Sequence, residues 1–114
     1  MSLNIVYIDD EQDLCEIFVI LHGSENNIIT FSRCENAVEY INLNYVDVVF
    51  VDYRMPCING FECREMFNKN IPTYLVSGEI GLVTPETFAG FIEKPINHDL
   101  IKSIIDSHSQ NKAS

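Results

Sequence analysis

The feature that most constrains this chain is a continuous apolar run, residues 48–51, that ends on Asp52. A strand with one face in water alternates apolar and polar residues, whereas a strand covered on both faces is apolar throughout. The run therefore predicts a central strand of a sheet that has helices on both sides. The aspartate that follows would lie at the carboxyl end of that strand.

Similar short runs alternate along the chain with segments of helical period. This alternation is typical of an α/β protein in which helices cover a parallel sheet. The predicted strands span residues 3–8, 27–31, 47–51, 72–76 and 88–92.

Helical periodicity and capping residues mark the segments between the strands. The first predicted helix has an apolar stripe at i, i+3, i+4 and i+7, formed by Leu14, Ile17, Phe18 and Leu21. Ser32 and Glu35 have the spacing of a capping box that would open the second helix. Asn59 is the expected cap of a third helix running to about Asn68, and Asn97 is the expected cap of the last helix.

Two segments lack a helical stripe. Residues 78–87 contain Gly81 and Pro85, so only about one turn of helix is expected before the last strand. Residues 108–114 are polar and are expected to form a frayed tail. The 114 residues are otherwise expected to form a single domain, residues 1–114.

Composition excludes several classes of protein. No apolar run approaches the roughly 20 residues that span a bilayer, and no signal-peptide pattern begins the chain, so we expect a cytoplasmic protein without membrane contact. The formal net charge of −10 argues against direct binding of nucleic acid. The four cysteines form no C-x-x-C pair, and we expect them to be reduced and mostly buried, without a disulfide framework.

Chemically active side chains follow the predicted strands. Asp9 and Asp10 follow the first strand, Asp52 the third, Ser77 the fourth and Lys94 the fifth. Because the carboxyl ends of parallel strands open on one edge of a sheet, these side chains are expected to meet. Each has an ordinary alternative as a helix cap, a turn residue or a solvated side chain, but those alternatives do not explain why all of them share one edge.

A divalent cation would relieve the repulsion among three adjacent carboxylates. Mg²⁺ prefers oxygen ligands and commonly combines one or two carboxylates with phosphate oxygens. Lys94 and Ser77 would contact an anion bound beside the cation. A cation site next to an anion site indicates phosphoryl transfer, with Asp52 as the nucleophile that becomes an acyl phosphate.

These residues carry a resemblance to a known family. The matching segments are Y-I-D-D-E (7–11), V-F-V-D-Y-R-M-P (49–56), N-G (59–60), L-V-S-G (75–78) and E-K-P (93–95). In order and placement they resemble the response-regulator receiver domain, the CheY-like superfamily of two-component signal transduction. The resemblance implies a flavodoxin-like three-layer sandwich with a parallel sheet of strand order 2-1-3-4-5 and helices on both faces. The fourth helix would be short or irregular here, because the segment of residues 78–90 is shorter than the corresponding segment in most members of the family.

The resemblance also implies roles for the residues of the site. Asp52 would be the phosphoacceptor and a ligand of Mg²⁺, with Mn²⁺ as a possible substitute. Asp10 and the backbone carbonyl of Arg54 would complete the ligands, and Asp9 would act through water. Lys94, followed by a cis peptide bond to Pro95, would pair with the phosphoryl group.

The family further implies a switch and a set of partners. Ser77 would move toward the phosphoryl group, and Phe91, the aromatic residue of the fifth strand, would rotate to fill the space. Arg54 and Glu79 match positions that tune dephosphorylation, and we expect them to form an ion pair over the site. The phosphoryl donor would be a histidine kinase, a histidine phosphotransfer protein or a small acyl phosphate. The downstream protein is not identified.

Such a domain would be a signalling module rather than an enzyme, because it catalyses only its own phosphorylation and slow dephosphorylation. A phosphatase of the haloacid-dehalogenase type would need a second aspartate where Arg54 stands, and a flavin binder would need a phosphate loop where Asp9, Asp10 and Glu11 stand. A protein-docking module that signals without phosphorylation remains the alternative. The chain is expected to be either a stand-alone receiver or a domain of a longer regulator.

Overall fold

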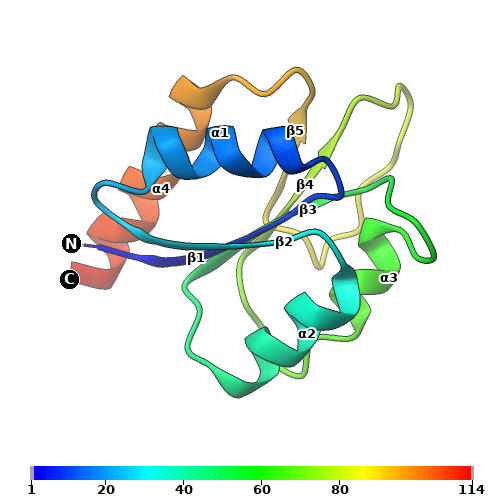
Figure 1. Ribbon diagram of the computed structural model, residues 1–114, viewed down its shortest axis with the longest axis horizontal. Coiled ribbons are helices and arrows are strands. Elements are labelled where there is room, and N and C mark those ends of the chain that lie inside the picture. Colours follow the sequence, from blue (N-terminus) through cyan, green and yellow to red (C-terminus); the bar gives the residue numbers. More distant parts are fainter. Residues whose placement is uncertain (1, 114) are drawn as a thin grey trace.

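A computed structural model describes residues 2–113 as a five-stranded sheet with four helices (Figure 1). The strands are β1 (Asn4–Ile8), β2 (Asn27–Phe31), β3 (Val48–Asp52), β4 (Thr73–Ser77) and β5 (Gly90–Glu93). The helices are α1 (Gln12–His22), α2 (Cys34–Leu43), α3 (Gly60–Glu65) and α4 (His98–Ala113). The strands lie close to the predicted ranges.

All strand pairings are parallel, and the strand order is β2-β1-β3-β4-β5. Both features confirm the predicted fold class. The register aligns Ile8 of β1 with Val51 of β3, so Asp9 and Asp52 leave adjacent strands at the same edge. Asp52 of β3 is in turn aligned with Val76 of β4, one residue before Ser77.

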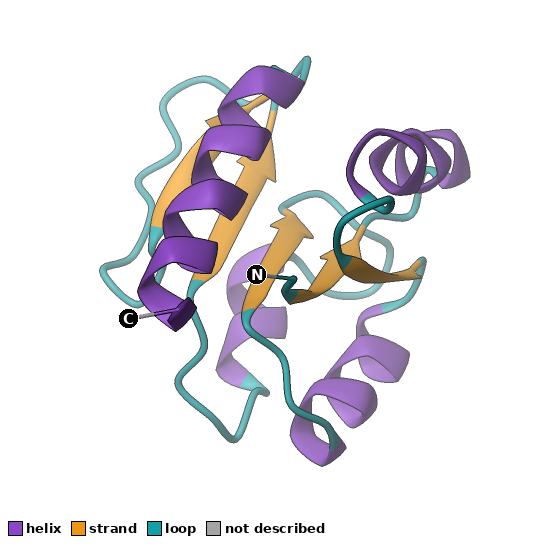
Figure 2. Cartoon of the chain, turned by 90° about the vertical axis from the view of Figure 1, so that its left-hand side faces the viewer, coloured by secondary structure: helices purple, strands orange, loops and turns teal. Residues whose placement is uncertain are grey.

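Helices cover both faces of the sheet, as Figures 1 and 2 show. Val48 and Phe50 of β3 pack on the side of α1 and α4, while Val49 and Val51 pack on the side of α2 and α3. All four side chains are fully buried. The unbroken apolar run of β3 is thus explained, because each face of the strand enters a separate hydrophobic core. None of the helices within residues 2–113 has the length and apolar character needed to cross a membrane.

Two predicted helix caps are present and one is wrong. Asn59 and Glu62 form a reciprocal capping box at α3, and the Asn97 side chain accepts from the backbone N–H groups of Asp99 and Leu100. The predicted box of residues 32–35 is absent. Arg33 occupies the cap position of α2 without a side-chain cap bond, and the Glu35 carboxylate pairs with the Arg33 guanidinium at 2.5 Å instead.

The structure confirms that the connection between β4 and β5 is irregular, and it corrects the predicted ends of two helices. Residues 78–89 contain turns but no helix. Helix α3 ends at Glu65 rather than near Asn68, whose backbone N–H donates to the Asn42 side chain.

The C-terminal segment is helical as far as Ala113, so the predicted frayed tail is wrong; Ser114 lies outside the described residues. Contacts with the body of the domain account for this order. His108 hydrogen bonds with the Tyr74 hydroxyl, and Lys112 pairs with Asp47 at 3.1 Å.

The cysteines also differ from expectation. Cys34 of α2 and Cys63 of α3 are joined by a disulfide, with their Cα atoms 6.1 Å apart. Cys15 is a buried free thiol and Cys57 an exposed one. Sequence spacing did not indicate the bond, because its partners are 29 residues apart and meet only when α2 and α3 pack on the same face.

Gly60 brings the start of α3 against the end of β3. Its backbone N–H donates to the Tyr53 carbonyl at 2.8 Å. A Cβ atom here would lie 2.8 Å from the Asp52 carbonyl oxygen and 2.8 Å from Leu75 Cδ1. Only a residue without a side chain allows this close approach between the end of β3 and the start of α3.

Replacing Gly60 with alanine should therefore destabilise the fold by about 1–3 kcal/mol, because the added methyl group meets backbone atoms that cannot move freely. The denaturant midpoint of unfolding measures the change. Gly78→Ala is a suitable control, since a Cβ at Gly78 would come no closer than 3.7 Å to the Lys94 side chain. Equal effects of the two substitutions would contradict this account of Gly60.

Candidate functional site

The residues predicted from the strand ends meet at one edge of the sheet. Carboxylate oxygens of Asp9, Asp10 and Asp52 all lie within 4.8 Å of one another. Lys94, which follows β5, reaches two of these carboxylates, at 3.2 Å from Asp52 Oδ1 and 3.4 Å from Asp9 Oδ2. The predicted acidic cluster and its lysine are thus brought together at the ends of three strands, β1, β3 and β5, that are distant in sequence.

Asp9 is the most completely enclosed member of the cluster, with no exposed surface. The Tyr7 hydroxyl donates to its Oδ2 at 2.8 Å, and the backbone N–H of Glu11 donates to its Oδ1 at 2.9 Å. Lys94 adds an ion pair. A buried carboxylate is costly without such partners, so these contacts hold Asp9 in one orientation.

The Asp52 carboxyl group is a weaker acid than an ordinary aspartate. Burial, together with the neighbouring Asp9 carboxylate, raises its pKa to about 6, although Lys94 acts in the opposite direction. The side chain is largely enclosed, with 4% of the residue exposed. One ammonium group therefore compensates the buried negative charge only in part.

Lys94 shows the complementary effect. Burial alone would lower the pKa of its ammonium group, but the Asp9 and Asp52 carboxylates raise it above its usual value. The group is thus charged at neutral pH. It can pair with an anion that approaches Asp52.

The donor set fits a hard divalent cation. Three carboxylates provide oxygen ligands, two of them buried and one, Asp10, exposed toward solvent. An exposed side meets the preference of Mg²⁺ for retaining several water molecules. The raised pKa of Asp52 is a second sign that the site would gain from added positive charge.

Ser77 and Glu79 lie beside this cluster on the β4 side. The Ser77 side chain is buried, and its Oγ accepts a hydrogen bond from the backbone N–H of Glu79 at 3.0 Å. The Ser77 hydroxyl group can still donate a hydrogen bond to another group.

Arg54 and Glu79 form the expected ion pair. Arg54 Nε lies 2.6 Å from Glu79 Oε1, and Nη2 contacts the same oxygen. The pair joins the segment after β3 to the segment after β4, with Arg54 exposed and Glu79 half-buried. Its hydrogen bonds, and then the charge of Glu79, raise the pKa of Arg54.

Two further predicted positions are located by the structure. Phe91 lies on β5 with 40% of its surface exposed. The peptide bond between Lys94 and Pro95 is cis, as expected.

The sequence interpretation assigned no role to Tyr7 or Cys15, which both contact Asp9. Tyr7 precedes Asp9 by two residues, a spacing that puts both side chains on one face of a strand and could have indicated their contact. Burial, and then the Asp9 carboxylate, raise the pKa of Cys15 to about 11. The protonated thiol lies 3.3 Å from the Asp9 carbonyl oxygen and donates to it.

Comparison with known proteins agrees with this arrangement. The profile of a family described as response regulator receiver domain matches residues 5–106. An uncharacterized response regulatory protein of Yersinia pestis is 29% identical over 117 residues, covering 96% of this chain and 49% of that protein. The autoinducer 1 sensor kinase/phosphatase LuxN of Vibrio harveyi is 25% identical over 112 residues, covering 91% of this chain and 13% of LuxN. The chain thus spans at most about half the length of these relatives.

A solved structure supports the fold. The CheY-like receiver domain from Methylobacillus flagellatus superimposes with a TM-score of 0.84 and 20% identity, covering 95% of this chain and 99% of that one.

The charge imbalance at Asp52 has a measurable consequence for stability. The pKa of Asp52 is about 6 in the folded state, compared with the usual value of 3.8 expected in the unfolded chain. Between these two pH values the folded state binds more protons than the unfolded state, so the free energy of unfolding should increase as the pH falls through 6. Without metal at neutral pH, Asp52→Asn should therefore be more stable than the parent by about 1–3 kcal/mol.

Urea unfolding in the presence of a chelator measures this gain, which should shrink as the pH is lowered toward 4. Asp106→Asn, at an exposed position of α4, is the control and should show no such gain. A gain that is absent, or that does not change with pH, would refute the charge imbalance.

Proposed function

Since the chain belongs to the response regulator receiver domain family, we propose that it accepts a phosphoryl group on Asp52 in a two-component or phosphorelay pathway. The supporting observation is the contact of Lys94 with both Asp52 and Asp9, inside a cluster of three carboxylates. This arrangement provides a nucleophile, a place for a cation and a fixed positive charge for an incoming anion. No other side-chain cluster among residues 2–113 combines these three properties.

The metal of this site would be Mg²⁺, with Mn²⁺ as a substitute. Asp10, Asp52 and the backbone carbonyl of Arg54 would hold it, with Asp9 acting through water. When bound, the cation would neutralise charge on the phosphoryl oxygens. The raised pKa of Asp52 and the exposed carboxylate of Asp10 both support this ligand set.

The reaction assigns one task to each side chain. A carboxylate oxygen of Asp52 attacks phosphorus as the bond from phosphorus to the donor's nitrogen or oxygen breaks, and an acyl phosphate forms. Lys94 pairs with a phosphoryl oxygen, while Asp9 keeps the ammonium group in position. The Ser77 hydroxyl donates a hydrogen bond to another phosphoryl oxygen.

Movement of Ser77 toward the phosphoryl group would carry the signal. The Ser77 side chain would give up its hydrogen bond from Glu79, and Phe91 would rotate from its exposed position into the space that becomes available. A half-exposed aromatic ring on an edge strand can change its rotamer without opening the core. The surface around β5 would then differ between the two states.

The partner that donates the phosphoryl group would be a histidine kinase or a histidine phosphotransfer protein. One relative of this chain is named as a sensor kinase/phosphatase, which agrees with this class of partner. The domain would be a cytoplasmic signalling module that catalyses only its own phosphorylation and slow dephosphorylation. Its formal net charge of −10 favours a protein rather than a nucleic acid as its direct target.

One observation favours a second candidate, a docking module that signals without phosphorylation. The connection between β4 and β5 has no helix, and it exposes Ile80 completely and Val83 to 85%. These side chains would form part of any surface that responds to the site. A partner could recognise them in a single state of the protein.

Phosphorylation distinguishes the two candidates. With Mg²⁺ and acetyl phosphate, the intact mass should increase by one phosphoryl group, because Asp52 is the enclosed nucleophile beside Lys94. Asp52→Asn should show no adduct, and chelation of the metal should prevent the reaction in the parent protein. Asp106→Asn should behave like the parent. An unmodified parent protein would favour the docking module.

The Arg54–Glu79 pair should control how long the phosphoryl group persists. The pair joins the two segments that flank the site, so it limits the approach of water to the acyl phosphate. Replacing both residues with alanine should change the phosphoryl half-life by about threefold or more, which corresponds to a change of at least ~0.7 kcal/mol in the barrier.

Loss of the adduct with time, followed by intact mass after removal of the donor, gives the half-life. A double substitution of Arg33 and Glu35 is the matched control, because it removes an exposed ion pair of the same type outside the acidic cluster. An unchanged half-life in the Arg54/Glu79 variant would remove these residues from the mechanism.

A further inference from the structure

Three of the four cysteines gather on the face of the sheet that carries α2 and α3. The Cys34–Cys63 disulfide joins these two helices. Cys57 lies in the loop between β3 and α3, where its thiol is free and exposed. The fourth cysteine, Cys15, is buried in the core on the opposite face of the sheet.

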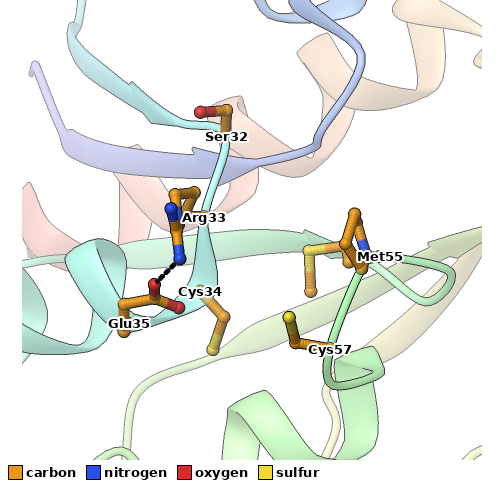
Figure 3. Close-up of a pocket in the computed structure, with 7 residues that line it drawn as sticks. Ser32, Arg33, Cys34, Glu35, Met55 and Cys57 are labelled. Carbon is orange, nitrogen blue, oxygen red and sulfur yellow. Dashed lines mark ion pairs between the residues drawn. The ribbon is translucent and has the colours of Figure 1, made fainter.

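Cys57 and one cysteine of the disulfide, Cys34, line the same pocket. The pocket has a volume of about 280 Å³ and lies between the segment that leads into α2 and the loop after β3. Its lining residues are Ser32, Arg33, Cys34, Glu35, Met55, Pro56 and Cys57. Figure 3 shows the side chains of Cys34 and Cys57 on the two segments that border this space.

The two sulfur atoms of the disulfide have different surroundings. Cys34 lines the pocket, whereas Cys63 is fully buried in the core and does not line it. A thiolate in the pocket would therefore meet the sulfur of Cys34. Cys63 would be the leaving group, and as a neutral thiol it would remain a small apolar side chain of the core.

The backbone at Cys57 also favours a role for its side chain. Its φ of 76° lies in the left-handed region, where a residue with a side chain is less stable than glycine. No described residue other than Cys57 and Gly81 has a positive φ.

We propose that Cys34, Cys57 and Cys63 form a thiol–disulfide exchange site. The Cys57 thiolate attacks the sulfur of Cys34, a Cys34–Cys57 bond forms, and the Cys34–Cys63 bond breaks. The sulfur of Cys63 leaves with the bonding electrons and takes up a proton in place of the one lost by Cys57. The protein is neither oxidised nor reduced overall, and no external reagent is consumed.

Exchange would move the covalent link without removing it. In the first form the link joins α2 to α3, and in the second it joins α2 to the loop that follows Asp52. The reaction does not depend on phosphorylation. It provides a second covalent modification of the segment that contains Arg54 and Met55.

Peptide mapping can distinguish the two links, because a glutamate lies between Cys57 and Cys63. Cleavage after glutamate places each cysteine in its own peptide, residues 12–16, 26–35, 40–62 and 63–65. The purified, non-reduced protein is incubated at a range of pH values and quenched with acid. Free thiols are then alkylated, and the digestion is done at mildly acidic pH to prevent further exchange.

The acid-quenched starting protein should contain peptide 26–35 linked to peptide 63–65. After incubation at slightly alkaline pH, a link from 26–35 to 40–62 should appear while alkylated 63–65 accumulates. Since the thiolate is the nucleophile, the initial rate should increase about tenfold for each pH unit between mildly acidic and neutral conditions.

Cys57→Ser is the matched control, because it alters an exposed position and leaves the disulfide intact. This variant should keep only the link between 26–35 and 63–65 at every pH. A parent protein in which that link never changes would overturn the proposal, as would one in which all four cysteines are alkylated without reduction. Links to peptide 12–16 in similar amount would also overturn it, because they would indicate scrambling in unfolded molecules.

Discussion

Two buried carboxylates that share one ammonium group are the interaction on which the rest of the site depends. Asp9 and Asp52 are almost completely enclosed, and Lys94 lies within 3.4 Å of both. Buried charge is costly without partners, so the ends of β1, β3 and β5 have little freedom to move relative to one another. Tyr7 and the backbone of Glu11 satisfy Asp9, but Asp52 keeps a raised pKa. The groups of the site therefore compensate its buried negative charge only in part, which supports the proposal that it binds a cation and a phosphoryl group.

The fold supports this arrangement by burying β3 on both faces. Separate cores form on the two sides of the sheet, and Gly60 allows α3 to begin directly against the end of β3. The loop that leads from Asp52 to α3 is consequently short and held by the Asn59 capping box. The connection from β4 to β5 lacks such contacts, because it contains no helix and its apolar side chains Ile80 and Val83 are exposed. The charged residues at the sheet edge and the exposed apolar side chains of the β4–β5 connection thus lie in segments with different structural support.

The disulfide adds a constraint that is independent of the charged site. Cys34 and Cys63 tie together the two helices on one face, while the other face has only the free Cys15. The pocket lined by Cys34 is also lined by Cys57, which lies in the loop that follows Asp52. Phosphorylation of Asp52 and thiol exchange at Cys57 would thus both modify the segment of residues 52–59.

The sequence alone determined the strands, their parallel arrangement and the identity of the acidic cluster, because apolar runs and the residues that follow them are local signals. It also indicated the Asn59 and Asn97 caps and the short or irregular structure of residues 78–90. Tertiary structure decided the features that depend on packing between distant segments. Glu35 pairs with Arg33 instead of forming a capping box. The helix continues through residues 108–113, where side chains contact Tyr74 and Asp47. Cys34 and Cys63 form a disulfide because α2 and α3 pack on the same face of the sheet. The raised pKa of Asp52 likewise has no counterpart in the sequence, since burial and neighbouring charge exist only after the chain has folded.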